Sequence, residues 1–171
     1  MRQILTTLAG AALLASCGPG EPTTLANAAE AIKQVNTNSD HVNIRLQFDG
    51  ATTASALAED LDDALAGISR SIADGASGIR PHNKFMLLDI RTGGGEIPDR
   101  FGNYRFDLSS FTSADGAARD GSDILNSLKD ADAGSGDMVP AFVAWCNAGS
   151  DEAQSLQPFC ERLAASWANN A

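Results

Sequence analysis

The side chains that most often carry catalysis or bind metals are few in this chain, and their spacing matches no known motif. The two histidines, His41 and His82, are far apart, and neither has a second ligand at helical spacing. The sequence contains no G-x-S-x-G, H-E-x-x-H or S-x-x-K motif, and the glycines at 93–95 lack the Lys-Ser or Lys-Thr of a phosphate loop. We therefore assign no catalytic residue, metal or cofactor, and expect both histidines at the surface.

One acidic run comes closest to a metal site. Asp130, Asp132, Gly134 and Asp137 follow the spacing D-x-D-x-G-x-x-D, which is how a calcium loop begins. Such a loop ends in a bidentate carboxylate at its twelfth position, which here is Ala141. The pattern favours an acidic, glycine-containing loop over a calcium site. A second acidic run, at 59–63, is expected to be the solvated face of a helix.

Positive charge is concentrated in residues 80–105, which hold five basic and three acidic side chains in a chain with net charge −10. We predict that this segment is a hairpin that contacts an anionic partner, with the glycines at 93–95 as an adaptable tip and an aromatic side chain as anchor. The alternative is a strand that simply alternates charged residues on its wet face. The predicted contact residues are Arg80, Arg91, Arg100, Phe101, Tyr104 and Arg105.

The N-terminus predicts export. Arg2 precedes an apolar stretch at 4–15, which is too short to cross a bilayer and is typical of a secretory signal. The stretch ends in Leu14-Ala15-Ser16-Cys17, which resembles the lipobox of bacterial lipoproteins. The resemblance covers residues 1–17 and implies a signal peptide at 1–16 that is cleaved before Cys17, whose thiol carries palmitate or a similar acyl chain. A plain cleaved signal and a buried free thiol at Cys17 are the alternatives.

The resemblance also implies a location. Residue 18 is glycine rather than aspartate, which in Gram-negative lipoproteins favours the outer membrane, facing the periplasm. The inner membrane and the cell surface remain open alternatives. Residues 17–24 then form a lipidated tether, and residues 25–171 a single domain.

The two remaining cysteines, Cys146 and Cys160, are predicted to form a structural disulfide, because an exported chain folds in an oxidising compartment. A redox pair is disfavoured, since such pairs usually have the spacing Cys-x-x-Cys. A cysteine nucleophile would need a histidine as its base.

Hydrophobic periodicity predicts a helix at 25–35, a half-buried strand at 42–48 and a long helix that begins at Thr52 or Thr53 and ends near 74. Residues 84–91 and 104–108 are predicted to form a hairpin. Short or medium helices are expected from Ser122, over 139–146 and over 156–167. The expected fold is α+β: a small mixed sheet of about three strands packed on the long helix, with a disulfide-linked C-terminal helical hairpin.

The acidic composition disfavours nucleic-acid binding, since phosphate recognition requires clustered lysine and arginine. The favoured function is a non-catalytic, membrane-anchored envelope lipoprotein that binds an envelope protein or an anionic polymer. One alternative is a periplasmic hydrolase or transferase, with Asp89, Glu96 and Asp99 as its first candidates. Another is a lipoprotein that binds a small ligand between the sheet and the C-terminal helices.

Overall fold

The computed structural model describes residues 24–170. The predicted signal peptide, Cys17 and most of the predicted tether lie outside the described residues. No described helix is both long and apolar enough to cross a bilayer. The helices are α1 (Ala54–Ala73), α2 (Gly121–Asn126), α3 (Met138–Asn147), α4 (Asp151–Ser155) and α5 (Gln157–Asn170), with short 3-10 turns η1 at Leu25–Asn27 and η2 at Leu108–Phe111.

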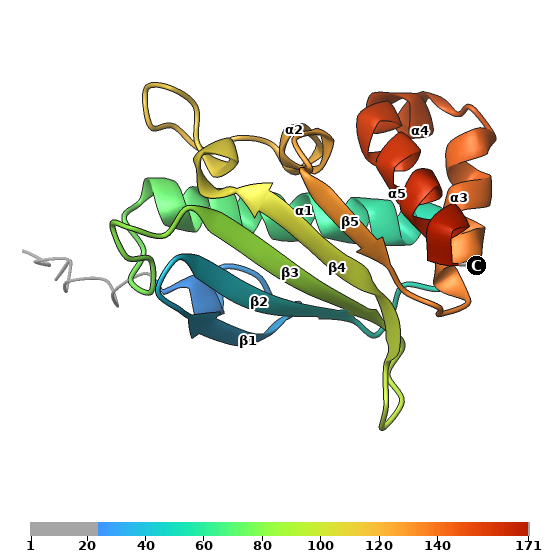
Figure 1. Ribbon diagram of the computed structural model, residues 1–171, viewed down its shortest axis with the longest axis horizontal. Coiled ribbons are helices and arrows are strands. Elements are labelled where there is room, and N and C mark those ends of the chain that lie inside the picture. Colours follow the sequence, from blue (N-terminus) through green and yellow to red (C-terminus); the bar gives the residue numbers. More distant parts are fainter. Residues whose placement is uncertain (1–23, 171) are drawn as a thin grey trace, which may run out of the picture.

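The strands form one mixed sheet in the order β1-β2-β3-β4-β5 (Figure 1). They are β1 (Ile32–Thr37), β2 (His41–Phe48), β3 (Phe85–Thr92), β4 (Asp99–Asp107) and β5 (Asp130–Ala133). β2 and β3 are parallel and connected by α1, and all other neighbours are antiparallel. The α+β class is thus confirmed, whereas the expectation of about three strands is corrected to five.

Strand β1 replaces the second half of the helix predicted at 25–35. Only Leu25–Asn27 form a helical turn, and Ile32–Thr37 pair with β2. Ile32 and Val35 fit a helical stripe, but as β-branched residues they also fit a half-buried strand. Pairing with β2 gives the backbone of this segment cross-strand hydrogen bonds that the isolated segment cannot make.

Strand β5 occupies the place of the predicted acidic loop. Its sequence, DADA, has low strand propensity. Its outer edge is held by α5, where the hydroxyl of Ser166 accepts a hydrogen bond from Ala133 N and donates one to Ala131 O (both 2.9 Å). Asn170 donates to Ala133 O at 3.1 Å. Hydrogen bonds from side chains of α5 to the backbone therefore stabilise a strand whose own sequence has low strand propensity.

Helix α1 lies along one face of the sheet (Figure 1). It begins after Thr53, whose hydroxyl accepts a hydrogen bond from Ala56 N at 3.2 Å, as expected of a helix cap. Alternate residues of β2 and β3 are buried in the same hydrophobic core as the apolar stripe of the helix. The opposite face of the sheet, here called the open face, carries the partly exposed residues of these strands.

The C-terminal helices pack beside β4 and β5 at one end of the sheet (Figure 1). The disulfide between Cys146 of α3 and Cys160 of α5 is present, which confirms that prediction. The space between these helices and the sheet is filled by aromatic rings. Phe142 lies 5.4 Å from Phe101 and 5.9 Å from Phe159 between ring centroids. A ligand at this interface, one of the sequence alternatives, would have to displace these core side chains.

Candidate binding surfaces

The β3–β4 hairpin ends in a tip, residues 93–98, that projects past the ends of the neighbouring strands (Figure 1). Gly93 opens the tip with a φ of +86°, a conformation that favours glycine, and its amide donates to Phe48 O at 3.1 Å. Within the described part of the chain, Ile97 is the one large apolar side chain left largely exposed, at 88%. The tip thus presents an isoleucine between Glu96 and Pro98.

The two aromatic residues predicted as anchors lie in the core instead. Phe101 and Tyr104 are 0% and 1% exposed. The pairing of β3 and β4 shifts register between Ile90 and Arg91, which leaves Phe101 as an extra residue in β4. Because of this irregularity, the consecutive residues Phe101 and Gly102 are both buried. The phenol of Tyr104 donates to Phe101 O at 3.2 Å, and burial raises its pKa. The structure therefore corrects the prediction that either ring anchors a partner.

The predicted arginines separate into two groups. Arg91, Arg100 and Arg105 extend from β3 and β4 near the open face, whereas Arg80 precedes β3, at the end of the hairpin away from the tip. Arg100 pairs with Asp132 and Arg105 with Asp130, both on β5. The guanidinium of Arg105 also lies 5.3 Å from the centroid of the Phe85 ring. These pairings neutralise two of the five positive charges that residues 80–105 carry.

Asp89 joins two further arginines at the centre of the open face. Its carboxylate accepts from Arg45 Nε at 2.9 Å and from Arg91 Nε at 2.8 Å. Partial burial raises the pKa of Asp89, but the hydrogen bonds and charges of Arg91 and Arg45 outweigh it and hold the pKa below its usual value. A carboxylate held ionised in this way is poorly suited to act as a general acid near neutral pH.

A cavity of about 360 Å³ lies on the open face and is here called the amide pocket. Four carboxamide side chains border it: two from β1, one from β2 and one from β4. The ion pair between Arg45 and Asp89 also lines it. Leu87 contributes an apolar side chain to its lining. The lining residues are Gln34, Asn36, Asn43, Ile44, Arg45, Leu87, Leu88, Asp89 and Asn103.

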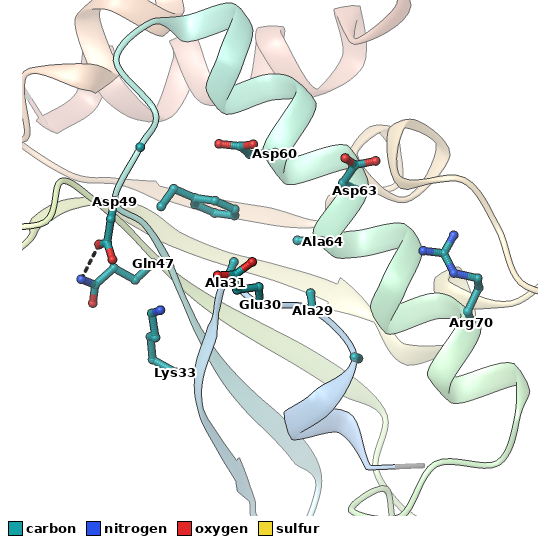
Figure 2. Close-up of a pocket in the computed structure, with 13 residues that line it drawn as sticks. Ala29, Glu30, Ala31, Lys33, Gln47, Asp49, Asp60, Asp63, Ala64 and Arg70 are labelled. Carbon is teal, nitrogen blue, oxygen red and sulfur yellow. Dashed lines mark hydrogen bonds between the residues drawn. The ribbon is translucent and has the colours of Figure 1, made fainter. Parts of the chain in front are cut away.

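A larger cavity of about 620 Å³ lies between α1 and the segment at 28–31 (Figure 2). Figure 2 shows Asp60 and Asp63 on the helix side and Glu30 and Lys33 across the gap. Asp60 and Asp63 are exposed, as expected for a solvated helix face. Among residues 24–170, no group of three or more potential ligands is placed to hold a metal ion.

The histidines and the calcium-like acidic run lie apart from one another. His41 Nδ1 lies 2.6 Å from Asp40 Oδ1 at the start of β2, and its side chain is 25% exposed. His82 is exposed in the loop before β3. Asp130 and Asp132, the first two residues of the calcium-like pattern, belong to β5 and pair with arginines of β4.

Two features were missed by reasoning from the sequence. The amide pocket combines residues from four strands, including β1, which the sequence had assigned to a helix. Ile97 had a local signal, since a β-branched apolar residue between glutamate and proline in a glycine-rich turn has no strand or helix stripe to join. No protein-family model, curated protein or solved structure matches the chain.

Proposed function

We propose that the chain is a lipid-anchored envelope protein whose folded part docks on another envelope protein through the tip of the β3–β4 hairpin. The observation that carries this proposal is the 88% exposure of Ile97 at the end of a projecting hairpin. Burying an isoleucine side chain contributes about 2 kcal/mol, enough for a central contact of an interface.

The charges around the tip favour a protein partner over an anionic polymer. Glu96 and the exposed Asp99 flank Ile97, whereas the arginines on the open face are paired with aspartates. A polymer of negative charge would meet little free positive charge here. The complementary partner surface is an apolar depression with a basic rim.

The docking proposal is tested in cells with a photo-crosslinking amino acid at position 97 and, as a matched control, at the exposed Asn169 of α5. We expect a crosslinked partner from position 97 only. In addition, Ile97→Glu should reduce co-purification of that partner by at least about tenfold, because the buried contact becomes an unpaired charge.

Ile97 contributes nothing to the described core, so this variant should unfold at the wild-type temperature. Equal crosslinking from positions 97 and 169, or a partner that Ile97→Glu leaves fully bound, would refute docking through the tip.

The anchor is a separate part of the proposal, supported by the lipobox-like residues 14–17. Two or more acyl chains hold a protein stably on a membrane without any apolar protein surface. In cells grown with radiolabelled palmitate, the wild type should carry label and fractionate with the outer membrane, and Cys17→Ala should lose both properties. A Ser16→Ala variant, which keeps a small residue before the cysteine, serves as control. Equal labelling of wild type and Cys17→Ala would rule out the anchor.

A further inference from the structure

We propose that the amide pocket on the open face binds a saccharide. The proposal is independent of the docking role of the tip, because it uses different residues and a different kind of contact.

The pocket is built from two neighbouring rows of side chains that cross four strands. Strand register places Asn36 beside Asn43, Asn43 beside Leu87, and Leu87 beside Arg105 in one row. Gln34, Arg45, Asp89 and Asn103 follow one another in the adjacent row. Arg105 lies outside the pocket, so with strands about 4.8 Å apart the lining extends about 10 Å along the first row and about 14 Å along the second. The site is therefore elongated, which suits an oligomeric ligand.

The four carboxamides are the first chemical argument. Each offers one acceptor and two donor hydrogens. Among the described residues, the side chains of Gln34, Asn36, Asn43 and Asn103 make no hydrogen bond to protein, and all four are at least partly exposed, so their full capacity faces the pocket or solvent. A sugar hydroxyl also donates and accepts, so a ring of amides can satisfy several hydroxyls whatever their orientation.

The floor and the ion pair are the second argument. Leu87 is partly exposed beside Asn43, and its apolar surface matches the C–H face of a sugar ring. Arg45 uses only its Nε–H on Asp89, which leaves further guanidinium donors for a hydroxyl or an N-acetyl carbonyl. A pocket with an apolar base and a few convergent polar groups is the usual form of a small-molecule site, and its volume lies within the usual range.

Other ligand classes fit less well. A phosphate or carboxylate ligand would meet only one net positive charge, because Arg45 and Arg91 share the carboxylate of Asp89, whereas the four amides offer neutral donors and acceptors. A peptide that adds a strand would pair with the outer edge of β1 and leave the amides of the inner strands unused.

The experiment follows the side-chain amide signals of the isotopically labelled full chain by NMR during titration with tetra-N-acetylchitotetraose. We expect saturable shifts at the amides of Asn43 and Asn103 and at the backbone of Leu87. Asn43→Ala and Asn103→Ala should each weaken binding by about tenfold, the loss of one or two hydrogen bonds to the ligand.

The matched control is Asn169→Ala, the same substitution on exposed α5, which should bind as the wild type does. Inorganic phosphate, titrated separately, should leave the pocket signals unmoved. Absence of saccharide-induced shifts, shifts insensitive to both pocket variants, or binding of phosphate alone would overturn the proposal. Because all three positions are at the surface, thermal unfolding of each variant should match the wild type.

Discussion

Asp89 is the residue on which the charges of the open face converge. Its carboxylate joins Arg45 on the neighbouring strand to Arg91 on its own strand, at hydrogen-bond distance in both cases. The side chain of Asp89 is 24% exposed, so the pair is shielded from solvent more than an ordinary surface ion pair. Removing the carboxylate would leave two guanidinium groups close together without a counter-charge.

We expect Asp89→Asn to lower the free energy of unfolding by about 1 to 2 kcal/mol at neutral pH. Because the folded-state pKa of Asp89 is lowered, its stabilising contribution is complete above the unfolded value of 3.8 and is lost as the pH falls through the lower folded value. Urea denaturation should therefore show a constant difference in the free energy of unfolding between wild type and Asp89→Asn from pH 7 down to about 3.8. The difference should disappear only at lower pH, where Asp89 is protonated in the folded protein.

Glu96→Gln at the tip is the matched control, since Glu96 is exposed and belongs to no ion pair of the described structure. It should leave stability nearly unchanged. A constant difference between wild type and Asp89→Asn at every pH would contradict the role assigned to this carboxylate.

At the scale of elements, the C-terminal helices depend on a covalent link and on aromatic packing. α4 is a single short segment, and α3 and α5 are joined by the disulfide, whose Cα atoms lie 5.6 Å apart. Phe142 and Phe159 pack on rings of β4, while Ser166 and Asn170 hold the edge of β5. Loosening this helical unit would therefore also expose the free edge of the sheet.

We expect the double substitution Cys146→Ala and Cys160→Ala to reduce the free energy of unfolding by about 3 kcal/mol, the value for closing a loop of this length. Chemical denaturation of the oxidised, reduced and doubly substituted proteins measures it, with the reduced wild type as a control for lost cysteine packing. Intact mass after alkylation without reductant should show neither thiol modified. Two alkylated thiols, or equal stability of all three forms, would contradict a structural disulfide.

At the scale of the molecule, the fold is one-sided. Helix α1 lies on one face of the sheet together with the core (Figure 1), and the open face carries mostly charged and amide side chains. The segment before β1 contacts the helix at Gly67. A Cβ added at Gly67 would lie only 2.3 Å from the carbonyl oxygen of Ala28. The N-terminal end of the described chain thus rests on α1 at a point where only glycine fits.

We expect Gly67→Ala to destabilise the protein by about 1 to 3 kcal/mol, because the clash with the backbone at Ala28 outweighs the better helix propensity of alanine. Thermal unfolding measures the effect. Gly50→Ala is the control, since its added Cβ would meet nothing within 4 Å. A stability of Gly67→Ala equal to or above that of the wild type would show that this close contact does not fix the segment on the helix.

The sequence by itself determined the elements with a strong local signal. Strict alternation located β2, one long apolar stripe located α1, and cysteine count and spacing predicted the disulfide. Each of these patterns is complete within one stretch of chain. The two edge strands were not predictable in this way, because β1 and β5 have weak patterns of their own and are stabilised by β2, β4 and α5.

Only the tertiary structure decided which predicted contact residues are at the surface. A register irregularity turns Phe101 inward, and aspartates from β3 and β5 neutralise the hairpin arginines. Charge counted along the chain could not reveal this, since Arg100 and Asp132 are adjacent in space and 32 positions apart in sequence. The sequence therefore identified the hairpin, whereas the fold buries the rings of Phe101 and Tyr104 and leaves Ile97 exposed at the tip. Burial and pairing depend on which segments meet, and that is settled only when the chain is folded.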